Sequence, residues 1–138
     1  MKRKIDFNDL MEEIKITDDS PFILQPKAFV LTTTKEEFSL PNNIIARLDG
    51  RSSLARIGVV VHLTAARFDP GWKGKAVMEL GNFGPMPVVL YAGVTRICAL
   101  TFETLSNHAE VPYLKQKDHA YANPKSPHAS KLNKELRK

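Results

Sequence analysis

Seven short runs rich in β-branched and aromatic residues follow one another from Phe22 onward, separated mainly by proline, glycine or asparagine. The runs are FILQP, AFVLTTT, IIARL, GVVVHLT, KAVMEL, PVVLYAG and RICALTFETL. Strands with this spacing are typical of a β-sandwich or β-barrel. A chain of 138 residues, 43% of them hydrophobic, can build one core but not two ordinary domains. The sequence therefore predicts a single, mainly β domain.

The chain divides by character into three parts. In the leader, residues 1–21, helical spacing of apolar residues ahead of the breaker-rich TDDSP predicts a short helix, which would bury Phe7, Leu10, Met11 and Ile14. The strand-forming runs occupy residues 22–113. Residues 114–138 are rich in proline and lysine and form a basic C-terminal arm.

The basic arm accounts for the positive charge of the whole chain, which is +5. Residues 115–138 carry seven Lys or Arg against Asp118 and Glu135, an excess of five. Aromatic residues are not interleaved with these charges, so nucleic-acid binding is not expected. We expect a segment poor in apolar anchors that is mobile alone and closes as a lid over an anionic ligand.

The chain has one cysteine, Cys98, in the apolar run ICALTF. A disulfide within the chain is therefore impossible, and a zinc site built on several cysteines is excluded. No apolar stretch approaches the length that crosses a membrane, and the first residues, MKRKIDFNDLMEEI, turn acidic where a signal peptide would turn apolar. We therefore expect a cytoplasmic protein that does not bind membranes.

One corner of the sequence, GRSSLARIG at residues 50–58, places Arg51 and Arg56 on either side of Ser52 and Ser53. Guanidinium and hydroxyl groups this close together form a compact set of donors for anions such as phosphates. The alternative is a short helical turn through Leu54, with both arginines solvated on its outer face. Residue types alone leave both interpretations open.

The segment DPGWKGKAVMEL puts a turn signal that begins at Asp69 ahead of a strand that carries Glu79. Alternation places Val77 on the same face as Glu79 and turns Ala76, Met78 and Leu80 the other way. A buried carboxylate can carry protons, whereas a glutamate on the outside of a strand is solvated or salt-bridged. The sequence permits both.

One segment combines three motifs: GRSSLAR, DPGW and a strand glutamate. This segment resembles the dCTP deaminase family of the trimeric dUTPase-like superfamily. It reads DGRSSLARIGVVVHLTAARFDPGWKGKAVMELGNFGPMPVVLYAG. The likeness continues through ALTFETLS to VPY and covers residues 22–113. It implies a distorted jelly-roll β-barrel that assembles as a homotrimer, with sites at the subunit boundaries. The usual N-terminal portion of the family is not evident ahead of FILQP, so we expect a shortened member or one half of a divided fold.

The resemblance also implies roles for individual residues. Glu79 corresponds to the residue that activates water for attack at C4 of cytosine and protonates the departing ammonia, and Ser52 and Arg56 hold the water and orient that glutamate. The implied contacts with the nucleotide, dCTP or dUTP, come from Arg51, Ser52, Ser53, Leu54, Ala55, Arg56, Ala65, Arg67, Asp69, Val77, Met78 and Tyr113.

The resemblance implies no zinc, and the sequence agrees because Cys98 and the four histidines, at positions 62, 108, 119 and 128, are scattered. Magnesium would arrive with the triphosphate instead of occupying a protein cage. His62 is expected to be a packed histidine rather than a ligand. The arm departs from the family, since Ala120 precedes Tyr121 where a lysine is usual and Pro124 replaces a glutamine.

Three other functions remain open. A dUTP diphosphatase would share the arginine-serine corner and use Asp69 to activate water at the α-phosphate, but it has no carboxylate at the position of Glu79. A bifunctional enzyme that converts dCTP to dUMP would keep both carboxylates. A non-catalytic relative would bind the nucleotide without turnover.

Overall fold

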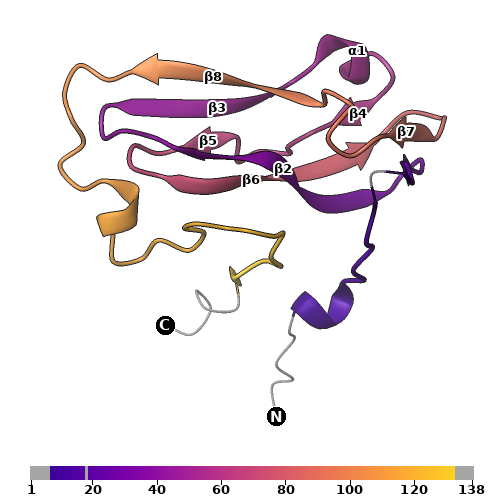
Figure 1. Ribbon diagram of the computed structural model, residues 1–138, viewed down its shortest axis with the longest axis horizontal. Coiled ribbons are helices and arrows are strands. Elements are labelled where there is room, and N and C mark those ends of the chain that lie inside the picture. Colours follow the sequence, from indigo (N-terminus) through magenta and orange to yellow (C-terminus); the bar gives the residue numbers. More distant parts are fainter. Residues whose placement is uncertain (1–6, 18, 133–138) are drawn as a thin grey trace.

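The computed structural model describes residues 7–17 and 19–132, which are arranged as short antiparallel strands with little helix (Figure 1). One three-stranded sheet has the order β2-β6-β4, and its strands are Phe29–Ser39, Lys73–Asn82 and Val59–Val60. A second has the order β5-β3-β8, with strands Arg67–Phe68, Ile44–Gly50 and Cys98–Thr104. Strands β1 (Phe22–Leu24) and β7 (Val88–Leu90) pair separately. The predicted mainly β class is confirmed.

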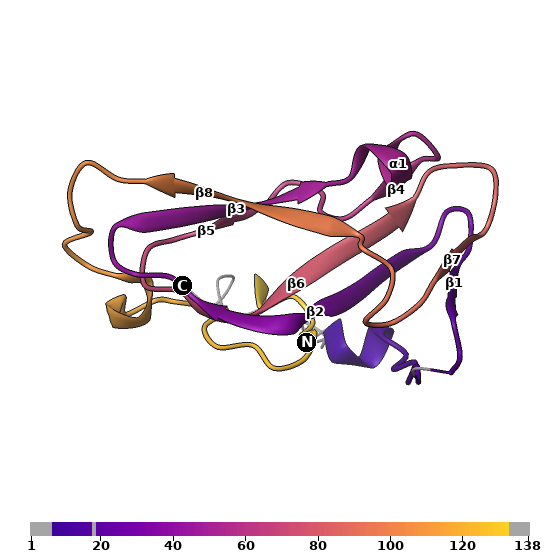
Figure 2. The same cartoon turned by 45° about the horizontal axis from the view of Figure 1, so that its top comes forward.

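Figures 1 and 2 both show the two three-stranded sheets lying one over the other. The larger core cluster draws on both sheets, on the β1–β7 pair and on Leu54, and it consists of Leu24, Leu48, Leu54, Val59, Val61, Met78, Leu80 and Leu90. A smaller cluster around Trp72 continues the core with Leu40 and Ala46. Both sheets therefore bury one face of each strand, as alternation requires.

Strand β6 is the central strand of its sheet and positions the glutamate of interest. Its side chains alternate, with Ala76, Met78 and Leu80 buried and Val77 and Glu79 half-buried on the opposite face. Pairing with β2 brings Leu31 opposite Glu79. The predicted orientation of this strand is confirmed.

Asn82, at the end of β6, is the buried polar residue that attaches the β1–β7 pair, since its side chain is only 1% exposed. Its Nδ2 donates to the carbonyl oxygens of Leu24 (2.9 Å) and Met86 (2.8 Å), and its Oδ1 accepts from the Gly84 N–H (2.9 Å). All three groups are satisfied by one amide, which explains why an asparagine is buried here.

Asn82→Asp should therefore lower the free energy of unfolding by about 3 kcal/mol at neutral pH, because an aspartate cannot donate to the two carbonyls and would be an unpaired buried charge. Urea unfolding followed by the fluorescence of the buried Trp72 measures this. Asn123→Asp is the matched control, since Asn123 is exposed and should change stability by less than about 0.5 kcal/mol. Equal shifts in both variants would contradict the role of Asn82.

The leader contains a 3-10 turn, η1 (Phe7–Leu10), and residues 11–17 have no regular structure. The helix expected through Met11 and Ile14 is therefore not formed. Both side chains are exposed, and without a partner surface so short a helix is marginal. Residues 1–6 and 18 of the leader, and 133–138 of the arm, lie outside the described residues.

The arm begins with a second 3-10 turn, η2 (Tyr113–Lys115), and its described part is attached to the start of β6. The Asn123 N–H donates to the Lys73 carbonyl (2.9 Å), and the Lys75 N–H donates to the Pro124 carbonyl (3.0 Å). Pro124 and Ala129 are buried. The sequence interpretation of the arm as poor in apolar anchors did not anticipate these two.

Pro124 reaches β6 because residue 74 is a glycine. Its φ is +141°, and a Cβ at that position would lie 2.5 Å from Cδ of Pro124. A side chain there would push the arm away from the strand.

Within the part of the chain that the structure describes, no helix is long and apolar enough to span a bilayer.

Candidate active site

The carboxylate of Glu79 is held by the backbone of another segment. Its Oε2 accepts a hydrogen bond from the Leu63 N–H at 2.9 Å, and its own backbone N–H donates to the Val61 carbonyl at 3.0 Å. Oε1 has no protein partner within residues 7–17 and 19–132. The half-buried carboxylate therefore has one oxygen fixed and one available to a ligand.

The arginine-serine corner forms one helical turn, α1 (Ser52–Ala55), directly after β3. Leu54 packs into the core and anchors the turn, and Gly58, with φ of +89°, ends the segment. The side chains of Ser52, Ser53 and Arg56 are exposed. The helical alternative for this corner is confirmed, and it leaves the polar groups facing outward, where they can meet an anion.

The two arginines of the corner differ in their contacts. Arg51 is exposed and donates from Nη1 to the Arg96 carbonyl at 3.1 Å. The guanidinium of Arg56 has no protein partner in the described part of the chain. A free guanidinium beside two hydroxyls is suited to a phosphate or carboxylate.

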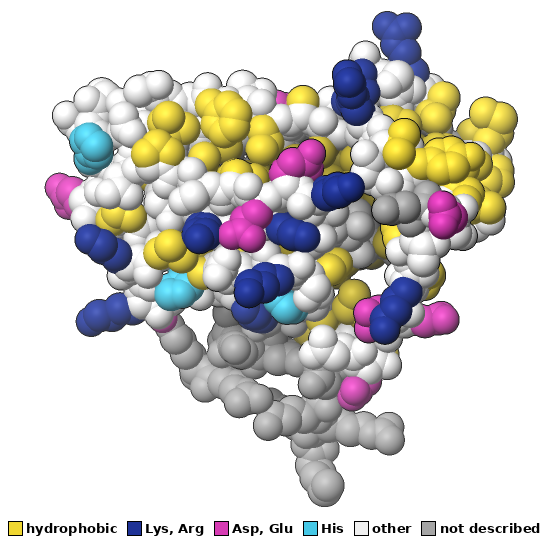
Figure 3. Space-filling view, in the orientation of Figure 1, with side chains coloured by type: hydrophobic (Ala, Val, Ile, Leu, Met, Phe, Trp, Pro, Cys, Tyr) yellow, Lys and Arg dark blue, Asp and Glu magenta, His cyan; other side chains and the backbone are white. Residues whose placement is uncertain are grey.

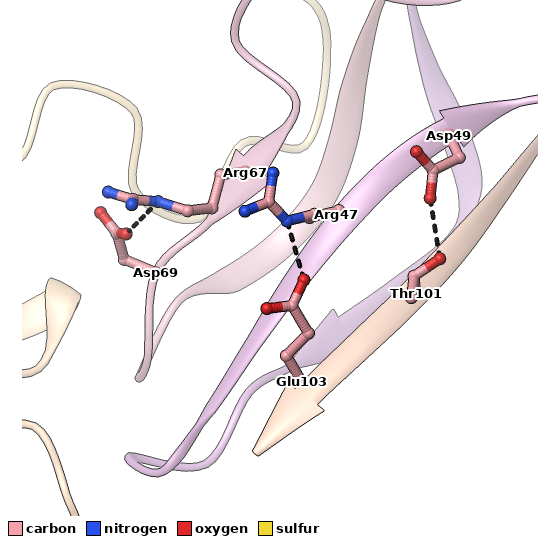
Figure 4. A network of polar contacts seen from close by, with 6 residues as sticks. All are labelled: Arg47, Asp49, Arg67, Asp69, Thr101 and Glu103. Carbon is pink, nitrogen blue, oxygen red and sulfur yellow. Dashed lines mark hydrogen bonds and ion pairs between the residues drawn. The ribbon is translucent and has the colours of Figure 1, made fainter. Parts of the chain in front are cut away.

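Asp69 forms an ion pair with Arg67 of β5, where Nε and Oδ1 are 3.1 Å apart (Figure 4). Tyr113 lies beside the same turn, because its N–H donates to the Pro70 carbonyl at 2.8 Å and its ring packs against the Trp72 cluster. The structure thus brings together three of the residues predicted from the sequence: Arg67, Asp69 and Tyr113.

The remaining predicted contact residues divide by burial. Met78 and Leu54 lie in the core, so only their backbone can reach a ligand. Val77 is half-buried beside Glu79 on the outer face of β6, whereas Ala55 and Ala65 are exposed. Side-chain contact with a nucleotide is therefore open to the polar members of the set and to Val77, Ala55 and Ala65, but not to Met78 and Leu54.

Polar contacts do not link Glu79 to the corner within the described chain. Within the described residues, no hydrogen bond or ion pair joins Glu79 or Asp69 to Ser52 or Arg56. Polar contacts within one described chain thus do not join the groups that the resemblance places in one site. Glu79 and Asp69 are called one set below, and the corner residues are called the other.

Sequence reasoning missed several polar partners. The Leu63 N–H is a backbone group, so no residue type announces it. Beside the Arg67–Asp69 pair, Arg47 donates to Glu103 (2.8 Å) and Thr101 donates to Asp49 (2.7 Å), as Figure 4 shows. The Arg47–Glu103 and Thr101–Asp49 contacts both follow from the register of β3 and β8, which pairs Arg47 with Thr101.

Two groups that could carry other chemistry are not arranged for it. Burial, and then the nearby Glu36 carboxylate, raise the pKa of the Cys98 thiol, so this cysteine is a poor nucleophile at neutral pH. His62 is half-buried, and its Nδ1 has no hydrogen-bond partner among the residues that the structure describes. Residues 7–17 and 19–132 include no group of three or more His, Cys, Asp or Glu placed to hold a metal ion.

Exposed apolar side chains gather at the end of the molecule where β7 lies (Figure 3). Phe83 and Val94 are each 75% exposed, and the patch also includes Met86, Val89 and Tyr91. Such a concentration is uncommon on a protein that remains monomeric.

A family model described as dCTP deaminase-like matches residues 1–105. The chain belongs to the dCTP deaminase-like family. A dCTP deaminase of Thermomicrobium roseum is 49% identical over 128 residues, which cover 93% of this chain and 64% of that protein. A dUMP-forming dCTP deaminase of Dictyoglomus turgidum is 50% identical over 125 residues, covering 91% and 64%. This dCTP deaminase-like chain thus spans about 64% of the length of these curated relatives.

The fold of this dCTP deaminase-like chain agrees with that membership. The crystal structure of 2′-deoxycytidine 5′-triphosphate deaminase from Agrobacterium tumefaciens superposes with a TM-score of 0.58 over 72% of this chain and 30% of that chain, at 23% sequence identity. The likeness shows that this chain shares the β fold of that deaminase structure, as the resemblance led us to expect.

Proposed function

We propose that this protein catalyses the hydrolytic deamination of dCTP to dUTP and ammonia, with Glu79 as general acid and base and without zinc. The observation that supports it best is the half-buried carboxylate of Glu79, with Oε2 held by a backbone N–H and Oε1 free of protein partners in the described chain. The curated relatives named dCTP deaminase, 49 to 50% identical, supply the substrate.

In the proposed reaction, Glu79 takes a proton from water as the water oxygen bonds to C4 of cytosine. The electron pair of the C4–N3 double bond moves onto N3 and returns to that bond when the amino group leaves. Glu79 then gives the proton to the amino nitrogen, the bond from C4 to that nitrogen breaks, and ammonia leaves. The 4-hydroxy product becomes uracil by tautomerisation, so dCTP and water yield dUTP and ammonia. General acid–base catalysis of this kind typically contributes about 10²- to 10⁴-fold.

We propose that the corner residues Ser52 and Arg56 act on Glu79 of another copy in a homotrimer. The lack of a hydrogen bond or ion pair between the two sets within one described chain supports this, as does the apolar patch near β7, which a second copy would cover. In the shared site, Ser52 holds the water, while the charge of Arg56 orients the glutamate.

The cytoplasmic location of the protein stays a prediction.

The nucleotide would be bound through both sets. Arg51 and Ser53 would meet the triphosphate, Asp69 the sugar, and the backbone beside Val77 the base. Magnesium fits this arrangement only as a partner of the triphosphate, because the donor set in the described residues is made of arginines and hydroxyls rather than clustered carboxylates. Bound there, the ion would neutralise phosphate charge.

A second candidate is the bifunctional reaction that continues to dUMP and pyrophosphate. It is favoured by the 50% identity to a dUMP-forming relative and by the presence of Asp69. In this chain Oδ1 of Asp69 pairs with Arg67, and Oδ2 has no ion pair within the described residues and could accept a water molecule.

One assay separates these functions. The protein is given dCTP and, separately, dUTP, and released ammonia and pyrophosphate are measured. Ammonia alone from dCTP supports the deaminase, and both products support the bifunctional enzyme. Pyrophosphate from dUTP without ammonia from dCTP would replace the proposal with a diphosphatase. Binding of dCTP without either product would replace it with a non-catalytic relative.

A further inference from the structure

A short segment, residues 61–66, carries the chain from the sheet of β6 to the sheet of β3. At one end the Val61 carbonyl accepts the backbone N–H of Glu79 at 3.0 Å. At the other end the Ala66 carbonyl accepts the Leu48 N–H at 2.8 Å. The segment is therefore tied to both sheets, and the Leu63 N–H that contacts Glu79 lies between the two ties.

The pairing of β4 with β6 slips by one residue where this segment begins. The register pairs Val59 with Asn82 and Val60 with Gly81, so its continuation would bring His62 opposite Glu79. The Glu79 N–H instead donates to Val61, one residue earlier. A slip of one residue is the mark of a β-bulge, a device that re-aims groups beside active sites.

The slip gives the Leu63 N–H a side-chain acceptor instead of a strand carbonyl. It donates to Oε2 of Glu79 at 2.9 Å, across a sequence separation of 16 residues. The Leu63 side chain is 50% exposed, so packing of that side chain does not explain the contact. A hydrogen bond from a backbone N–H to a carboxylate is stronger than one between neutral groups.

We propose that the Leu63 N–H is a positioning group for the reaction: it fixes Oε2 of Glu79 and leaves Oε1 to take and return the proton. This inference rests on the proposed function. The last torsion of a free glutamate side chain is broad, so an unanchored carboxylate would spread over many orientations. Two hydrogen bonds from one segment, to the backbone and to the side chain of the same residue, restrict it.

The test removes the N–H and keeps the side chain. Incorporating the α-hydroxy analogue of leucine at position 63 replaces the His62–Leu63 amide with an ester, and Leu63→Pro removes the same donor genetically. Both should lower kcat for ammonia release from dCTP by roughly tenfold to a hundredfold, the loss expected for one hydrogen bond to a charged group. KM should change by less than about twofold, because the nucleotide contacts are made elsewhere.

Leu63→Ala is the matched control, since it removes the side chain and keeps the N–H, and its kcat should fall by less than about threefold. If the proline variant does not fold, the ester variant decides, because it introduces no ring. Unchanged kcat in the ester protein, or an equal loss in Leu63→Ala, would overturn the inference while the deaminase proposal stands. Absence of ammonia release from the unmodified protein would instead overturn the proposed function.

Discussion

Glu79→Gln should lower the turnover of dCTP by at least about a hundredfold, the contribution typical of a general acid or base. Glutamine keeps nearly the same volume and an oxygen that can still accept the Leu63 N–H, so the local structure should persist. It cannot accept a proton from water and return it to the leaving nitrogen. Ammonia release under saturating dCTP measures the loss.

Binding of dCTP should survive the same substitution, because Arg51, Ser53 and Asp69 are unchanged. Calorimetric titration with dCTP checks this point. Glu103→Gln is the matched control: Glu103 is an exposed carboxylate whose partner is Arg47 on the neighbouring strand, and its loss should change kcat by less than about twofold. Near wild-type ammonia release from the Glu79→Gln protein would exclude Glu79 as the acid and base.

Local patterns were enough to predict seven of the eight strands of the described chain and the face that carries Glu79, whereas the two-residue strand β5 (Arg67–Phe68) lies outside the predicted runs. Alternation in KAVMEL is a property of neighbouring residues, and the core of a sandwich imposes it directly. The turn around Leu54 could likewise be predicted, as one of two alternatives, from an apolar residue set among polar ones. These features depend on periods of two and of about 3.6 residues, which the sequence carries itself.

The contacts of the site could not be predicted because they depend on backbone groups and on tertiary register. The partner of Glu79 is an N–H that every residue except proline possesses, so Leu63 has no distinguishing mark. The arm was misjudged because Pro124 is an anchor only against Gly74, a close approach that composition does not reveal. The leader has helical spacing but no surface to bury it against.

Two inactive variants should restore activity to each other when they assemble together. Glu79→Gln damages the set on β6, and Arg56→Ala damages the corner. No hydrogen bond or ion pair within one described chain joins the two residues. In a trimer with each site shared by two neighbours, some mixed sites receive Glu79 from one variant and Arg56 from the other. Each trimer that contains both variants should have one intact site in three, and these mixed trimers should release ammonia at about one third of the wild-type rate.

Co-expression with two different affinity tags, and purification on both in succession, isolates the mixed assemblies. Light scattering on the unmodified protein should give about three times the chain mass of 15.5 kDa. Glu79→Gln mixed with Glu79→Ala is the control and should stay inactive, because no partner then supplies the carboxylate. If Glu79 and Arg56 instead served one site within the same chain, every chain in the mixture would be defective, and no activity would return.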